Sequence, residues 1–186
     1  MKLHPTSKAS SDFRLCREFD CWRGLDFDEK YKCAIEVLPS ARIMIELDIV
    51  SCSVTLDVAQ EIAECLKEAL AISVDDDGYQ VEVKKRPNGL FKIRSLAGMR
   101  GMQYAAFGEI DVEDASGDFF EDSSSGTTSI VVATIQDGGH ELIFPFMGYS
   151  FTKADAAWLS EALFKACGER KNREGRARDV TVEPSL

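Results

Sequence analysis

The sequence has no long hydrophobic run and few histidines. No uninterrupted apolar segment approaches the roughly 20 residues that a membrane-spanning helix requires. Residues 1–11 are polar and lack the apolar segment of a signal peptide, so we expect a cytoplasmic protein that does not bind membranes. The two histidines, His4 and His140, offer little material for general acid–base catalysis.

Motifs for catalysis and cofactor binding are missing as well. The chain contains no GxSxG, HExxH, P-loop or GxGxxG string, and no two cysteines have CxxC spacing. Its acidic segments lack the ligand spacing of an EF-hand. We therefore expect no catalytic residue, no metal ion and no cofactor.

The balance of charge excludes another class of partner. The chain carries 22 Lys and Arg residues against 32 Asp and Glu residues, which gives a formal net charge of −10. Nucleic-acid binding needs a basic surface that neutralises phosphates, so we expect none here. A basic protein partner is favoured instead, because a negative surface accelerates association with a positive one.

The six cysteines fall mostly within apolar strand-like or helical patterns. In a cytoplasmic protein such thiols behave as small buried hydrophobic residues. One alternative stays open, an enzyme or small-ligand binder with a pocket between sheet and helices that uses Cys52, Cys65 or His140. His140 directly follows Gly138 and Gly139, a position that favours a solvent-facing turn histidine.

Three segments in the first part of the chain alternate between apolar and polar residues. They run from Phe13 to Cys21, from Tyr31 to Val37 and from Arg42 to Val54. A period of two is typical of half-buried strands, and polar turns separate the segments. We expect three strands in an antiparallel meander.

Helices are predicted over residues 55–71 and 152–167. In the first, Thr55 is a suitable N-cap and Asp57 falls in the first turn, where the helix dipole favours a carboxylate. Thr152 is the corresponding N-cap of the second helix, and Gly168 is its expected C-terminal stop. Apolar residues recur at spacings of three and four in both segments, so each helix should bury one face.

The two predicted helices resemble each other at a constant offset of 97 residues. The identical types are Ser53, Thr55, Ala59, Glu64, Leu66 and Ala69 in the first copy, and Ser150, Thr152, Ala156, Glu161, Leu163 and Ala166 in the second. This correspondence indicates an internal duplication. Convergence of two amphipathic helices on one pattern is the alternative.

The second half is predicted to contain further strands around an acidic segment. Strand-like patterns occur near residues 79–83, 90–96 and 102–112, and Asp137, Gly138 and Gly139 predict a hairpin between residues 130–135 and 141–146. The segment 109–129 is acidic, and from Glu113 onward it is rich in Ser, Gly and Asp, which predicts a long mobile loop. Residues 169–186 lack apolar periodicity and should form a disordered basic tail.

These patterns together predict an α+β fold. Antiparallel sheet would be built from two halves, residues 12–72 and 73–168, each a β-meander closed by a helix, with both helices packed on one face. Residues 1–11 are expected to be a disordered leader. On the opposite face, Met44, Val50 and Cys52 are apolar enough to suggest a homodimer.

Surface character then gives the functional hypothesis, a small non-enzymatic protein-binding module of the inhibitor, immunity, chaperone or adaptor type. The acidic loop should bind the basic partner, with two adjacent phenylalanines as apolar anchors. Its expected partner-binding residues are Asp111, Glu113, Asp114, Asp118, Phe119, Phe120, Glu121 and Asp122. A structural homodimer component is the second alternative.

Overall fold

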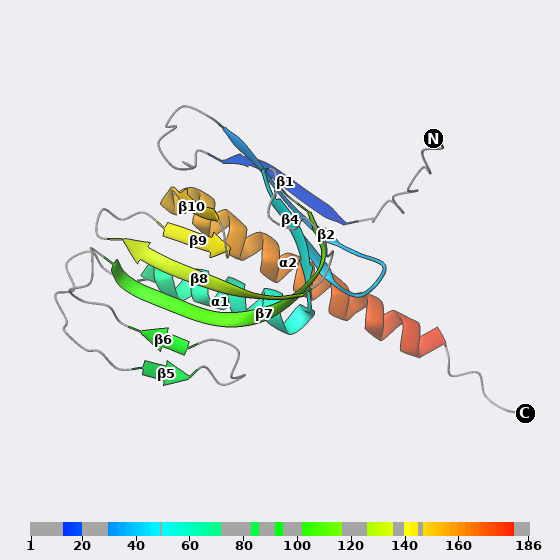
Figure 1. Cartoon of the computed structure of the whole chain (residues 1–186). Helices are drawn as coiled ribbons and strands as arrows, with labels where there is room; N and C mark the ends of the chain where they lie inside the picture. Colours follow the sequence, from blue (N-terminus) through cyan, green and yellow to red (C-terminus); the bar gives the residue numbers. More distant parts are fainter. Residues whose placement is uncertain are drawn as a thin grey trace, which may run out of the picture.

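The computed structural model describes residues 13–19, 30–48, 50–71, 83–85, 92–94, 102–116, 126–135, 140–144 and 147–180 (Figure 1). The described residues form ten strands and two helices. In chain order these are β1 (Arg14–Phe19), β2 (Tyr31–Val37), β3 (Ile43–Leu47), β4 (Val50–Val54), α1 (Leu56–Ala71), β5 (Val83–Lys85), β6 (Lys92–Arg94), β7 (Met102–Ser116), β8 (Gly126–Ile135), β9 (His140–Phe144), β10 (Met147–Phe151) and α2 (Lys153–Val180).

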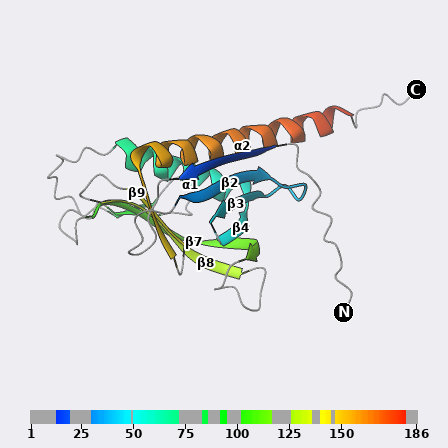
Figure 2. The ribbon, with the colours of Figure 1, turned by 90° about the horizontal axis from the view of Figure 1, so that it is seen from above.

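The strands form one antiparallel sheet in the order β1-β2-β3-β4-β7-β8-β9-β10, and β6 pairs with both β7 and β5. Strand β4 joins the first group of strands to the second by pairing with β7. Helices α1 and α2 pack against each other and lie side by side on one face of the sheet (Figure 2). The predicted α+β class and the packing of the two helices are confirmed, whereas the duplication stays a prediction.

The predicted third strand, residues 42–54, is in fact the hairpin β3–β4. The chain reverses after Leu47, which pairs with Val50, and Asp48 in this turn takes a φ of 54°. Buried apolar side chains occupy odd positions up to Leu47 and even positions from Val50 onward, and the polar Ser53 is buried as well. This change of phase is the signature of a tight hairpin, and in the sequence Ile49 obscures it by continuing the odd pattern.

The connection between β7 and β8 is shorter than the loop of residues 109–129 that the sequence predicts. Strand β7 continues to Ser116 and β8 begins at Gly126, so part of the expected loop 109–129 is paired strand. Ile110 and Val112 are buried, and Ala115 returns to the buried side after an irregularity at Asp114, whose φ is 48°. The extra residue of such a bulge breaks the period of two, which is why the alternation after Val112 is difficult to detect.

Both helices begin as the sequence predicts. The Thr55 hydroxyl accepts from Val58 N at 3.4 Å, and the Thr152 hydroxyl accepts from Asp155 N at 3.2 Å. Asp155 Oδ2 also accepts from the Thr152 hydroxyl at 2.8 Å. Both threonines are therefore N-caps, and each holds the start of its helix directly behind a strand.

Helix α2 does not end at Gly168 but continues to Val180, so residues 169–180 are helix rather than a disordered tail. An exposed glycine inside a helix costs only about 1 kcal/mol. The following residues are mostly good helix formers, and Glu169 and Glu174 each stand four residues before an arginine, the favourable order of charges. In Figure 2 this part of α2 extends beyond the strands.

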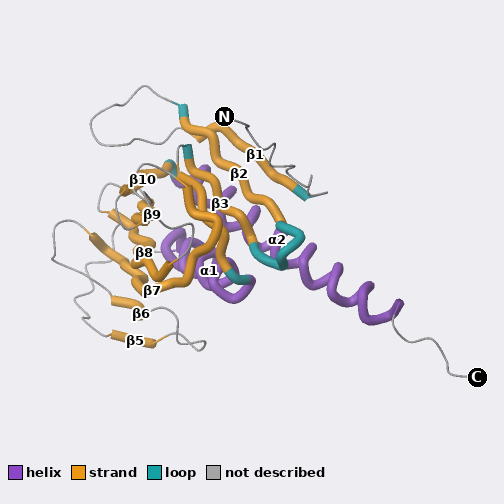
Figure 3. The backbone as a smooth tube through the Cα atoms, turned by 45° about the vertical axis from the view of Figure 1, so that its right-hand side comes forward, coloured by secondary structure: helices purple, strands orange, loops and turns teal. Residues whose placement is uncertain are grey.

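The core lies between the helices and a strongly curved sheet (Figure 3). Because of the curvature, side chains of β10 reach strands at the other end: the hydroxyl of Tyr149 donates to Leu47 O at 3.0 Å. Phe19 of β1 contacts Phe151 of β10 and Trp158 of α2, with ring centroids 5.3 and 5.5 Å apart. These contacts bring the first and last described strands together around the start of α2.

The opposite face of β1–β3 is charged. Arg14 forms ion pairs with Glu36 and Glu46 across these three strands. The predicted apolar dimer face is wrong, because the β3–β4 turn places Val50 and Cys52 in the core and leaves Met44 half-buried. None of the described helices is long and apolar enough to cross a membrane.

Candidate functional site: an acidic groove beside helix α1

The junction between β4 and β7 is held by a nearly buried arginine. Arg42, whose side chain is 13% exposed, donates to the Ser53 hydroxyl at 3.1 Å and to Ser53 O at 2.9 Å. The nitrogen that contacts Ser53 O, Nη2, also donates to Asp111 O at 3.3 Å. The other terminal nitrogen, Nη1, lies 3.2 Å from Glu113 Oε1. One guanidinium therefore links two strands that are separated by a large stretch of sequence.

This junction engages two of the acidic residues that the sequence assigns to partner binding. Ser53 Oγ donates toward Glu113 O at 3.0 Å and Asp114 Oδ2 at 3.2 Å, and Glu113 is paired with Arg42. The carboxylates of Glu113 and Asp114 thus have contacts within the chain. Both carboxylates therefore contact residues of the β4–β7 junction.

Asp111 lies differently, because it faces an open groove. This groove has a volume of about 540 Å³ and lies between the first turns of α1 and the middle of β7. Thr55, Asp57, Val58 and Gln60 line it from the side of α1, and Glu109, Ile110 and Asp111 from β7. We refer to these seven residues as the acidic groove.

All three charged residues of the acidic groove are carboxylates. Asp57, Glu109 and Asp111 are exposed, whereas Val58 and Ile110 are buried. Asp111 Oδ1 accepts from Thr127 Oγ1 at 3.1 Å, which orients this carboxylate. The site therefore presents three exposed carboxylates, which favour a positively charged side chain.

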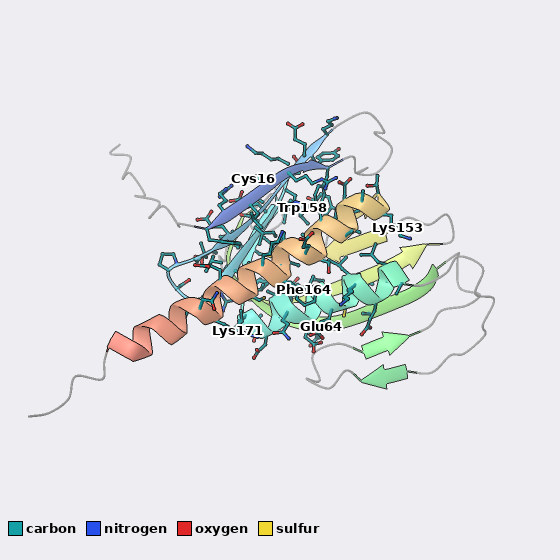
Figure 4. The ribbon with its side chains drawn as sticks, turned by 180° about the vertical axis from the view of Figure 1, so that it is seen from behind. Cys16, Glu64, Lys153, Trp158, Phe164 and Lys171 are labelled. Atoms are coloured by element: carbon teal, nitrogen blue, oxygen red, sulfur yellow. The ribbon has the colours of Figure 1, made fainter. Side chains whose placement is uncertain are left out.

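A lysine of helix α2 contacts one residue of the acidic groove from outside it. Lys171 Nζ donates to Gln60 Oε1, a groove side chain, at 3.2 Å. Figure 4 shows Lys171 on α2 next to α1. The chain's own ammonium group thus forms a hydrogen bond with a polar side chain of this site.

The thiols of the described cysteines on β4, α1 and α2 are buried. Burial raises the pKa of the Cys52 thiol to about 12 and that of Cys167 to about 11. Cys65 is completely buried in α1. A protonated thiol without access to solvent is a poor nucleophile, so Cys52 and Cys167 have the properties of core residues.

Two further sequence hypotheses concern metal ions and His140. Among the residues that the structure describes, no three His, Cys, Asp or Glu side chains converge closely enough to hold a metal ion. His140 is the first residue of β9, and its side chain lies outside the described part of the chain.

The other predicted partner-binding residues also fall outside the described part. They are Asp118, Phe119, Phe120, Glu121 and Asp122, in the connection between β7 and β8. The structure therefore brings Asp111, Glu113 and Asp114 to one strand, places Asp111 in the groove, and leaves the two phenylalanines as a prediction.

Sequence reasoning missed Arg42 and the α1 side of the groove. Thr55 and Asp57 are recognisable from the sequence as helix-start residues, but no pattern indicates that the start of α1 lies opposite Glu109–Asp111. That proximity arises from the β4–β7 pairing, a contact between distant segments. Comparison of the chain with protein-family models, curated protein sequences and solved structures found no match.

Proposed function

We propose that this protein is a non-enzymatic protein-binding module whose acidic groove receives a Lys- or Arg-containing segment of a basic partner protein. The observation that carries the proposal is the lining of the groove: every charged side chain there is a carboxylate, and all three are exposed. Opposite charge accelerates the encounter with a basic partner and disfavours acidic ones.

The position of Lys171 supports this choice of partner. Its ammonium group already forms a hydrogen bond with Gln60 at the groove, so the polar surface of the site is compatible with a basic side chain. We expect the partner's segment to lie across β7 and the first turn of α1.

The test compares three versions of the protein as bait in a native lysate, at low and at high salt. The groove variant is Asp57→Asn/Glu109→Gln/Asp111→Asn, which keeps hydrogen-bond acceptors but removes three charges. The matched control is Asp48→Asn/Glu68→Gln/Glu161→Gln, which removes three charges at exposed positions outside the groove. Mass spectrometry identifies captured proteins, and the association rate of the best candidate is then measured with purified components.

We expect the wild type and the control variant to capture the same basic protein at low salt and to release it at high salt, because salt screens exposed charges. The groove variant should associate about tenfold more slowly or worse. Equal association of all three versions would overturn the proposal for this groove. Thermal unfolding of the groove variant, compared with the wild type, verifies that its fold is retained.

A further inference from the structure

Strand β1 presents a self-complementary edge. Among the described strands it pairs with β2 alone, at one end of the sheet order. An unpaired edge offers backbone N–H and C=O groups to any further strand of suitable sequence. The partner that this edge suits can be inferred from its hydrogen-bonding phase and its charges.

The backbone phase follows from the β1–β2 ladder. Val37 N donates to Phe13 O at 3.2 Å, so the pair next to Arg14–Glu36 is a hydrogen-bonded pair. Hydrogen-bonded and non-hydrogen-bonded pairs alternate in an antiparallel ladder. The backbone groups of Arg14, Cys16 and Glu18 therefore point away from β2, toward the outer edge of the sheet.

The side chains of the same three residues are exposed on the outer face of the sheet. Arg14 is positively charged, Cys16 in the centre is neutral, and Glu18 is negatively charged. If a second β1 lies antiparallel with Cys16 opposite Cys16, each Arg14 faces the Glu18 of the other copy. This arrangement produces two opposite-charge pairs and matching backbone donors and acceptors.

In the paired arrangement, the alternation of positive and negative charges continues from β1 to β2 in both copies. Within one chain, Glu18 stands opposite Lys32 and Arg14 opposite Glu36. Across the paired edges, Lys32 and Glu18 of one copy would be followed by Arg14 and Glu36 of the second copy. The signs of these four charges alternate. Neighbouring registers lack this property: an axis at Arg17 places two arginines face to face, and an axis at Leu15 places Arg14 opposite Cys16.

We infer that two copies of this chain associate through antiparallel pairing of their β1 edges, about a twofold axis at Cys16. The edge is six residues long, so the interface is smaller than that of a permanent dimer. The dimer should be weak and concentration-dependent. It is independent of the acidic groove, which lies on β7 and α1.

Sedimentation velocity from about 5 to about 500 µM tests the association directly. We expect a shift from monomer to dimer for the wild type and for Cys16→Ser. Glu18→Arg, which places two arginines opposite each other, should weaken the dimer about tenfold or more. The control Glu68→Arg makes the same change of charge on α1 and should dimerise like the wild type.

Cross-linking then tests the register. Diamide, as the oxidant, takes up two electrons and two protons from two thiols, so a Cys16–Cys16 disulfide forms only where the sulfur atoms meet. We expect this bond to form about tenfold faster than a disulfide in Cys16→Ser/Ser129→Cys, whose exposed thiol on β8 meets its counterpart only by collision. A monomer at every concentration, or equal cross-linking rates, would overturn the inference.

Discussion

The hydroxyl of Ser160 donates to the backbone oxygen of Ala63 at 2.8 Å, inside the buried contact between α2 and α1. These two residues are separated by 97 positions, the same offset that relates the two helices in the sequence. Equivalent positions of the two helices therefore meet where the helices are in contact. Because both residues lie in the buried contact between the helices, the size of their side chains is critical.

Ala63→Leu should destabilise the protein by about 1–3 kcal/mol, because the added atoms have no space between two helices in contact. Ala157→Leu makes the same substitution at an exposed position of α2 and should change stability little. Urea denaturation of both variants measures the free energy of unfolding. Equal stability of the two variants would show that the helices do not approach each other closely at Ala63.

Tyr149→Phe should lower stability by about 0.5–1.5 kcal/mol. The substitution removes the buried hydrogen bond from Tyr149 to Leu47 O while keeping the ring that packs on Phe151. The effect is measured by thermal and urea unfolding. An unchanged midpoint would mean that the curved sheet does not depend on this link between β10 and the end of β3.

Arg42→Lys should cost about 1–3 kcal/mol, although the charge is retained. A lysine cannot reproduce the planar set of donors that reaches Ser53, Asp111 and Glu113 together. Glu113→Gln is the comparison, and it should cost less than about 1 kcal/mol because the Glu113 side chain is 55% exposed. If both variants unfold at the same urea concentration as the wild type, Arg42 does not hold the β4–β7 junction.

The stability of the protein should fall with rising pH above about pH 9, partly because of Cys52. The unfolded chain releases this thiol proton near its ordinary pKa of 9.0, whereas burial in the folded chain raises the pKa to about 12. Between these values the unfolded state binds fewer protons, so alkali favours unfolding. Cys52→Val should show a shallower decline in unfolding free energy between pH 9 and 11, and an identical slope would contradict the assignment.

Local patterns in the sequence determined much of the architecture. Strands β1 and β2, the N-caps at Thr55 and Thr152, and the acidic character around Asp111 were all recognisable, because each depends on neighbouring residues. The turn at Asp48 and the bulge at Asp114 were missed, since one residue with positive φ shifts the alternation without changing its composition. The length of α2 was missed because a glycine permits a stop but does not impose one.

The candidate site was decided by tertiary structure. Glu109 and Asp111 lie opposite Asp57 only because β4 pairs with β7, and nothing local to either segment specifies that pairing. The same fold buried Cys52 and Cys65, which the sequence left available for chemistry, and it left the charges of β1 at the edge of the sheet. The sequence by itself therefore determined most of the elements and the sign of the net charge, whereas long-range strand pairing and burial decided which residues are exposed and which lie side by side.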